Sequence, residues 1–483
     1  MSDEFDAVVD DVRARVSPTD DERGQLQRVA DAVIADAEAA VADLPVDAEV
    51  VQVGSTARGT WTAGDRDVDV FVCFPPSLDR EELETYGLTV GHEVLPEGRE
   101  EYAEHPYVVG EREGYAVDLV PCYAVEDATE IQSAVDRTPF HTRYLQERLD
   151  DDSAGAVRVA KQFLKGIGVY GSDLRTRGFS GYLTELLVLE YGSFRAFVEA
   201  VADWHPPVRL DPEAHGTETF DDPLVVIDPT DPERNVAAVL SATNVATLQH
   251  YARDLLAEPR VSLFTEREPN PFSPADIEAA VSRRDTTPVA LRFAAPDIVD
   301  DQLWPQLRKS LDGLCSELDR RGFEVLRSAA FVEAGAAADT DRGTGGERRP
   351  IEDTMADGDS GPASQRDAVL LLEFAVAERP AVERHEGPPV HVRAHASGFF
   401  EKYDDDPEVA GPFIDGDRYV VERPRAVTTA VEFLSSSAVF DVGLGPRIES
   451  ALGEDYEVLV GAELAALATG FGVDLADYFD PKP

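Results

Sequence analysis

Cysteine is scarce in this chain of 483 residues. The sequence contains 3 cysteines, Cys73, Cys122 and Cys315, and no two of them form a C-x-x-C pair. An odd number of cysteines in a long chain indicates a reducing compartment rather than a disulfide framework. We therefore expect the protein to be cytoplasmic.

Long apolar runs are also missing. No stretch approaches the roughly 18 apolar residues that a membrane-spanning helix needs. The N-terminal stretch MSDEFDAVVDDVRARV is acidic and lacks the basic and apolar regions of a signal peptide. Because 43% of the residues are hydrophobic, we expect a globular protein, of about two to four domains for this length, that does not contact a membrane.

Basic residues are few, and lysines are fewer still. The chain has 95 acidic and 44 basic residues, which gives a net charge of −51. This charge fits a protein that avoids nucleic acid, or one adapted to a very salty cytosol, where repulsion is screened within about 3 Å at 1 M salt. The acidic residues are spread along the whole chain, and only five basic residues are lysines: Lys161, Lys165, Lys309, Lys402 and Lys482. These two features favour salt adaptation, so the net charge says little about the substrate.

The first 150 residues mix helical and strand patterns. Apolar residues recur at helical spacing over residues 4–16 and 21–43. Two strands, a helix and a hairpin are then predicted, in the stretches AEVVQVGS, DVDVFVCF, LDREELETYGLTVGHEVL and YVVGEREGYAVDLVPCY. Residues 1–150 are therefore predicted to form an α+β domain with a small sheet.

The remaining chain is predicted to divide into three parts. Residues 151–265 are mainly helical in pattern. Residues 266–398 show a strand-helix-strand-strand order that predicts half of a ferredoxin-like sheet, with a flexible Gly-, Asp- and Ala-rich insertion at 335–366. Residues 399–483 are predicted to hold two or three short helices. We see no internal repeats.

Two carboxylates interrupt the apolar strand DVDVFVCF. Asp67 and Asp69 are two residues apart, so on a strand they project to the same face while Val68 and Val70 face the core. Like charges on one face repel each other unless a cation lies between them, and Mg²⁺ is the natural partner of carboxylate oxygens. Two solvated strand carboxylates are the alternative interpretation.

Neighbouring residues strengthen the prediction of a nucleotide site. Gly54 and Ser55 follow a strand, where backbone N–H groups and a hydroxyl can receive phosphate, and Arg58 can fork onto phosphate oxygens. Asp118 interrupts the strand GYAVDLVPCY, as Asp67 and Asp69 interrupt theirs. If the two strands are neighbours, three carboxylates can hold two metal ions that activate a hydroxyl and stabilise a leaving pyrophosphate. For Asp118 the alternative is a polar position on an edge strand.

This order of motifs resembles the polymerase-β nucleotidyltransferase superfamily. More closely, the chain resembles the archaeal, class I CCA-adding tRNA nucleotidyltransferases, in the stretches GSTARGTW, DVDVFVCFP, YAEHPYV, VDLVPCY, SAVDRTPFH, RGFSGYLTELL, DPERNVAA and PDIVDD, from about residue 50 to 305. The resemblance implies a polymerase-β-like nucleotidyltransferase head, a helical neck, a ferredoxin-like RNA-binding body and a helical tail. It also implies addition of C, C and A to the tRNA 3′ end from CTP and ATP, with two Mg²⁺ ions and no nucleic-acid template.

The resemblance also assigns roles to single residues. The metal ligands and catalytic residues are Asp67, Asp69 and Asp118; the predicted nucleotide contacts are Ser55, Arg58, His141, Lys161, Tyr170 and Arg234. Other interpretations stay open: a structural hydrogen bond for His141, a surface position for Lys161, core packing for Tyr170, and pairing of Arg234 with Asp228 or Asp231.

Two rival functions remain at this point. One is another RNA 3′-terminal nucleotidyltransferase, such as an oligo- or poly(A)-adding enzyme, and the other is a non-catalytic RNA-binding relative. The expected partner is tRNA, bound through its acceptor stem and 3′ end, and a homodimer is left open. The acidic stretch EKYDDDPEVAGPFIDGD in the predicted tRNA-binding tail departs from the basic surface that RNA binding favours.

Overall fold

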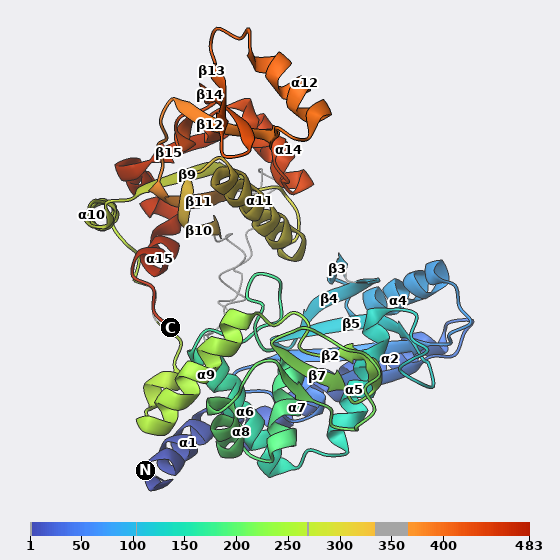
Figure 1. The fold of residues 1–483 in the computed structure, drawn as a ribbon. Coiled ribbons are helices and arrows are strands. Elements are labelled where there is room, and N and C mark those ends of the chain that lie inside the picture. Colours follow the sequence, from blue (N-terminus) through green and yellow to red (C-terminus); the bar gives the residue numbers. More distant parts are fainter. Residues whose placement is uncertain (1, 103, 268–269, 334–365) are drawn as a thin grey trace, which may run out of the picture. The chain divides into compact units, whose positions relative to one another are not determined.

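We analysed a computed structural model, which describes residues 2–102, 104–267, 270–333 and 366–483 (Figure 1). The described chain forms two compact units, one of residues 2–267 and the other of residues 270–333 and 366–482. Within the described residues, no helix is long and apolar enough to cross a membrane. The predicted insertion lies outside the described residues, except for Arg366.

A five-stranded sheet opens the first unit. Its order is β1-β2-β5-β4-β3, where β2 and β5 are parallel and the other neighbours are antiparallel. The strands are β1 (Glu49–Val53), β2 (Asp67–Phe74), β3 (Arg99–Tyr102), β4 (Pro106–Arg112) and β5 (Tyr115–Tyr123). Except for the short edge strand β3, these strands match the predicted ones.

Two helices cover one face of this sheet. Helix α2 (Asp20–Ala42) begins at a capping box formed by Thr19 and Glu22, and α4 (Arg80–Val94) follows β2. Alternation along β2 turns Val68, Val70 and Val72 into the core that these helices share with the sheet. The opposite face carries the polar residues of β2 and β5.

Helices dominate the rest of the first unit, as predicted. One core joins the helices α1 (Ser2–Val16), α6 (Asp151–Gly166), α7 (Gly181–Tyr191), α8 (Phe194–Ala202) and α9 (Ala242–Ala257). The first helix of the chain packs here, through Phe5, Val12 and Val16, because its apolar stripe meets α6. The shorter elements of this unit are α3 (Gly54–Ala57), α5 (Arg137–Gln146), β6 (Val208–Leu210), β7 (Leu224–Asp228) and β8 (Asp231–Asn235).

A four-stranded antiparallel sheet forms the centre of the second unit. Its order is β10-β11-β9-β15, from β9 (Thr287–Ala294), β10 (Glu324–Val332), β11 (Asp367–Val376) and β15 (Glu457–Val460). Helices α11 (Asp300–Arg320) and α14 (Pro446–Glu454) pack on one face, and α10 (Pro274–Arg284) and α15 (Ala468–Phe479) on the other. The chain order around this sheet is β-α-β-β-α-β, so the fourth strand comes from the C-terminal part of the chain.

The segment 399–483 contains the short helices that were predicted, but also strands that were not. Besides α13 (Ala430–Leu434), α14 and α15, it contains β15 and a hairpin of β13 (Ala410–Asp415) and β14 (Arg418–Pro424). This hairpin pairs with β12 (Val382–Pro389) beside α12 (Arg393–Tyr403). These strands contain proline and many charged residues, so their sequences lack the apolar alternation that predicts a strand.

Candidate active site

The structure places the three predicted carboxylates on one face of the first sheet. Strands β2 and β5 run parallel in a register that sets Asp69 directly beside Asp118. Asp67 precedes Asp69 by two residues and therefore projects to the same side. Their neighbours Val68 and Val117 are a register pair too, and both are buried on the opposite face.

The negative charges of these carboxylates raise one another's pKa. Burial, together with the charges of Asp118 and Asp67, raises the pKa of Asp69 to about 7. Burial and the charge of Asp67 raise the pKa of Asp118 to about 6. In the described part of the chain, no three histidine, cysteine, aspartate or glutamate side chains are already grouped as a metal site. To hold one cation, the three carboxylates would have to turn toward a common point.

The turn after β1 lies directly against this acidic face. Gly54 has a φ of +78°, and a Cβ atom on it would collide with the carboxylate of Asp69. Only a glycine at position 54 lets the backbone approach the Asp69 carboxylate so closely just before Ser55. The turn thus places Ser55 directly after Gly54, the residue whose backbone lies against Asp69.

Arg58 and Lys161 meet at a buried carboxylate that the sequence analysis missed. Arg58 Nη2 lies 2.9 Å from Glu185 Oε2, and Lys161 Nζ lies 3.4 Å from Glu185 Oε1. Arg58 also donates to Thr142 Oγ1 at 3.2 Å, and Lys161 donates to the carbonyl oxygen of Thr60 at 3.1 Å. Both cations are almost fully buried, and Glu185 is completely buried. The surface position considered for Lys161 is therefore wrong, and Arg58 is not a free guanidinium.

The charges in this cluster support one another. Burial alone would raise the pKa of Glu185, but Lys161 and Arg58 outweigh it and hold that pKa below its usual value. Burial lowers the pKa of Lys161, whereas Glu185 counteracts this effect. The only sequence signal for this cluster was an acidic residue within the apolar helix GYLTELLVLEY.

His141 and Arg234 meet at a second buried carboxylate, Asp228. His141 Nε2 lies 2.8 Å from Asp228 Oδ2, and Arg234 Nη1 lies 2.7 Å from the same oxygen. The ring of His141 stacks on Tyr182 with the centroids 3.9 Å apart. His141 comes from α5, Arg234 from β8 and Tyr182 from α7, so the contacts join distant parts of the sequence. The pairing of Arg234 with Asp228, one of the alternatives left open, is thus present.

Tyr170 lies beside the lysine-bearing face of α6. It forms an isolated bridge with Phe179, and Lys165 Nζ lies 5.5 Å from the centroid of its ring. Burial raises the pKa of Tyr170, so its hydroxyl stays protonated.

Arg58 links the three groups of residues. The charge of Arg58 opposes the increase that burial causes in the pKa of Asp69. Its guanidinium also donates a hydrogen bond to Thr142, which follows His141 in the chain. The strands and helices that carry these residues, β2, β5, α5, α7 and β7, lie in one unit (Figure 1). The site therefore combines an acidic face with two buried carboxylates, each holding basic side chains.

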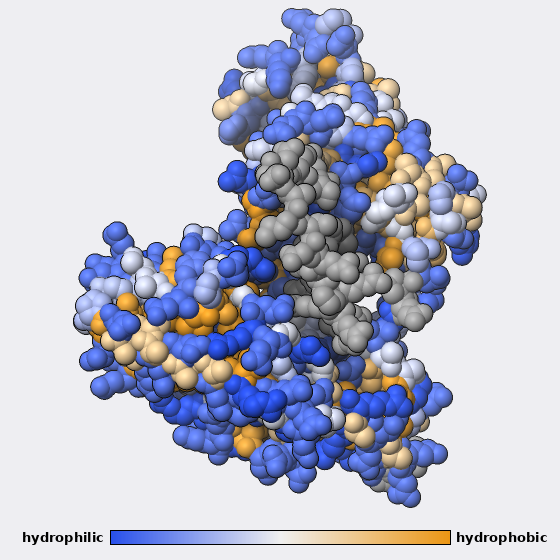
Figure 2. All heavy atoms as spheres, turned by 180° about the vertical axis from the view of Figure 1, so that it is seen from behind, coloured by the Kyte–Doolittle hydropathy of each residue, from blue (hydrophilic) through white to orange (hydrophobic). Residues whose placement is uncertain are grey.

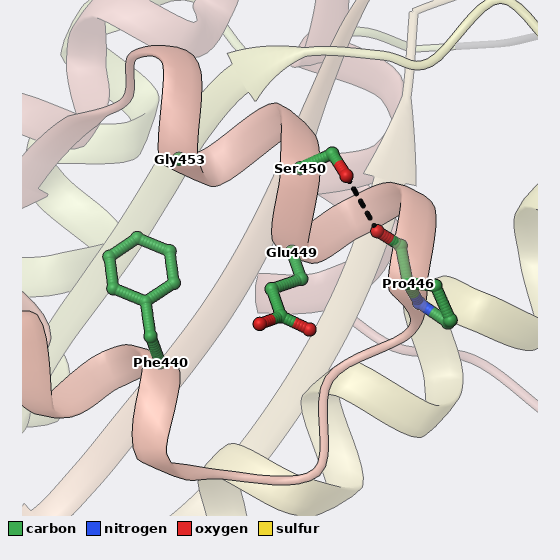
Figure 3. A pocket seen from close by; sticks show the side chains of 5 residues that line it. All are labelled: Phe440, Pro446, Glu449, Ser450 and Gly453. Carbon is green, nitrogen blue, oxygen red and sulfur yellow. Dashed lines mark hydrogen bonds between the residues drawn. The ribbon is translucent and has the colours of Figure 1, made fainter.

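The second unit contains a separate hollow, drawn in Figure 3. It is lined by Phe440, Pro446, Glu449, Ser450 and Gly453, and none of the predicted site residues lies in it.

Comparisons with known proteins cover both units. Three family models match: "Nucleotidyltransferase domain" over residues 35–141, "tRNA nucleotidyltransferase, second domain" over 155–265, and "CCA-adding enzyme, C-terminal domain" over 284–338 and 359–461. The chain is 83% identical to the CCA-adding enzyme of Haloarcula marismortui and 58% identical to that of Halorubrum lacusprofundi, each over the full length of both chains. It is 36% identical to the CCA-adding enzyme of Methanosarcina mazei over 94% of both chains. The chain therefore belongs to the family of CCA-adding enzymes, the tRNA nucleotidyltransferases anticipated from its motifs.

Proposed function

We propose that this chain adds and repairs the 3′-terminal CCA of tRNA, using CTP and ATP and no nucleic-acid template. The observation that carries this proposal is the full-length identity of 83% to a CCA-adding enzyme. The parallel register of Asp69 and Asp118 supports it independently, because it gives the sheet an acidic face suited to nucleotidyl transfer.

We further propose that Asp67, Asp69 and Asp118 are the catalytic metal ligands. Their oxygen donors and mutual repulsion suit Mg²⁺. When bound, two such ions supply activation of the attacking hydroxyl and charge neutralisation at the leaving pyrophosphate. In this account the carboxylates orient the terminal 3′-hydroxyl of tRNA toward the α-phosphate of the incoming nucleotide.

The predicted nucleotide contacts divide into two sets. We propose that Ser55 and Arg58 meet the triphosphate, since Ser55 follows Gly54, which approaches Asp69, and the charge of Arg58 acts on Asp69. We propose that Lys161 and Tyr170 support them. Because Arg58 and Lys161 are paired with Glu185, we propose that they act chiefly as a fixed positive charge. The side chain of Arg234 is 35% exposed, so it can reach a base, and His141 is placed beside it.

The parts of the chain are proposed to have separate roles. These are a catalytic head over 1–150, a helical neck over 151–265, a ferredoxin-like body over 266–398 and a tRNA-binding tail over 399–483. The β-α-β-β-α-β order of the second unit supports the ferredoxin-like assignment, although its fourth strand lies in the predicted tail. The acceptor stem of tRNA as partner, a location in the cytoplasm and a homodimer remain predictions.

The direct test offers a tRNA that lacks its CCA end, together with Mg²⁺ and either each nucleoside triphosphate singly or CTP and ATP together, at high KCl. We expect two additions with CTP alone, and one further addition only when ATP is present as well. A ladder of added A with ATP alone would instead identify an oligo- or poly(A)-adding enzyme. No addition at all, with tRNA binding retained, would identify a non-catalytic RNA-binding relative.

A further inference from the structure

Asp228, at the end of β7, is the most densely hydrogen-bonded carboxylate near the proposed nucleotide contacts. Its side chain is fully buried. Oδ2 accepts from His141 Nε2 at 2.8 Å and from Arg234 Nη1 at 2.7 Å. Oδ1 accepts from the backbone N–H of Thr230 at 2.9 Å, its hydroxyl at 2.8 Å and the hydroxyl of Tyr182 at 3.3 Å. Both oxygens are therefore fixed, and the carboxylate cannot rotate without losing several bonds.

The charge of Asp228 is maintained by the groups around it. A buried carboxylate without partners would be costly, and burial alone would raise its pKa. The contacts with His141 and Arg234 outweigh this effect and hold the pKa of Asp228 below its usual value. Burial raises the pKa of Tyr182, so its hydroxyl stays a donor. Asp228 thus remains an anion that binds Arg234 strongly.

The same carboxylate sets the orientation of the histidine ring. Burial lowers the pKa of His141, so the ring is neutral at neutral pH and uses its Nε2 proton for Asp228. This assigns the tautomer and leaves the second nitrogen, Nδ1, for a ligand. Tyr182 stacks on the ring at an interplanar angle of 16° and prevents it from tilting.

Exposure increases outward from Asp228. The exposed fraction of the side chain is 0% for Asp228, 13% for His141 and 35% for Arg234. A ligand can therefore reach the imidazole and the guanidinium but not the carboxylate. Asp228 can influence a bound nucleotide only through the two side chains that it holds.

We propose that Asp228 is a positioning residue, which fixes the His141 ring and the Arg234 guanidinium in the orientation that receives the incoming CTP or ATP. This proposal rests on the proposed function. It predicts that loss of the Asp228 carboxylate weakens nucleotide binding and base discrimination more than it slows the chemical step, because the metal-binding face on β2 and β5 is untouched.

The test measures KM and kcat for CTP and ATP, and incorporation of UTP, in Asp228→Asn. An amide carries no charge, and because its NH2 group only donates, it cannot accept hydrogen bonds at the positions of both Oδ1 and Oδ2. We expect KM for CTP and ATP to rise about ten- to a hundredfold, because the loss of a charge-assisted hydrogen bond weakens binding by about that factor. We expect kcat to fall less and UTP incorporation to increase. Asp254→Asn is the matched control, because Asp254 also pairs with an arginine, Arg260, but near the surface. It should leave both constants unchanged.

A double-mutant cycle separates positioning from general stability. If Asp228 acts partly through Arg234, the KM increase caused by Asp228→Asn should be clearly smaller in an Arg234→Ala background, where only the part that acts through His141 remains. Additive effects, or an unchanged KM in folded Asp228→Asn, would overturn the proposal. If Asp228→Asn does not fold, Thr230→Val can replace it, because this substitution removes one hydroxyl bond to Asp228. A wild-type KM in Thr230→Val would then overturn the proposal. Wild-type protein that fails to add C and A would instead contradict the proposed function itself.

Discussion

Glu185 shows how much a single buried side chain supports in this protein. It is completely buried between the cations of Arg58 and Lys161 and also accepts from the hydroxyl of Thr60. Removal of the negative charge leaves two buried cations without compensation. Breaking a buried ion pair in this way typically costs about 3–5 kcal/mol.

We therefore expect Glu185→Gln to lower the free energy of unfolding by about 3 kcal/mol. Urea titrations in concentrated KCl measure it. Glu190→Gln is the control, because Glu190 lies on the same helix α7 but is exposed. Equal stability of the two variants would show that the Glu185 cluster contributes nothing to folding.

Single residues also show which features of the site the sequence predicts and which it does not. Strand alternation is a local property, so the sequence alone predicts that Asp67 and Asp69 share one face of their strand. The same kind of interruption in a second apolar strand indicates Asp118. The partner of Arg58 is 127 residues away in the chain, at Glu185, and no local pattern connects them. Tertiary contacts of this kind decide whether a basic residue is free or paired.

At the scale of elements, Glu373 joins three parts of the second unit. This buried residue of β11 accepts from Arg284 of α10 at 2.6 and 2.9 Å, and from the hydroxyl of Tyr478 of α15 at 3.1 Å. Burial alone would raise the pKa of Glu373, but these bonds and that of Thr286 hold it below its usual value of 4.5.

The sign of the pH effect follows from this shift. Because the pKa of Glu373 is lower in the folded state, its contribution to stability is fully present above about pH 4.5 and is lost as the pH falls through the folded-state value. We expect the free energy of unfolding to fall less steeply below pH 4.5 in Glu373→Gln than in the wild type. Glu278→Gln, on an exposed position of α10, should keep the wild-type slope. Identical slopes in all three proteins would contradict this account.

Elements with regular apolar spacing could be predicted, whereas short polar strands could not. Helix α2 has buried residues at helical spacing and a Thr19–Glu22 capping box, so its limits follow from the sequence. Strands β13 and β14 have few buried residues, and β15 has only four residues, so pairing with distant strands defines them. The missed strand β15 completes the sheet of the second unit.

At the scale of the whole molecule, the acidic surface is the dominant property. Figure 2 shows one face covered mainly by hydrophilic side chains, in agreement with the net charge of −51. Relatives from Haloarcula marismortui, Halorubrum lacusprofundi and Halobacterium salinarum, which are halophilic archaea, support the prediction of salt adaptation.

Salt should therefore stabilise this protein. The screening length falls from about 10 Å at 0.1 M to about 3 Å at 1 M salt, which weakens the repulsion among surface carboxylates. We expect the midpoint of thermal unfolding to rise by about 10 °C or more between 0.1 and 3 M KCl, since a few kcal/mol produce such a change. A midpoint that is constant or falls with KCl would contradict the salt-adaptation account.

The central claim is that the carboxylates of Asp67, Asp69 and Asp118 carry the metal-dependent chemistry. Its most direct test is the incorporation of labelled CTP and ATP into tRNA lacking CCA, with Mg²⁺ at high KCl, by the wild type and Asp118→Ala. We expect the variant to bind tRNA almost as the wild type does but to lose activity by about a thousandfold or more, because metal stabilisation contributes several kcal/mol. Nucleotide addition at the wild-type rate by Asp118→Ala would contradict the claim.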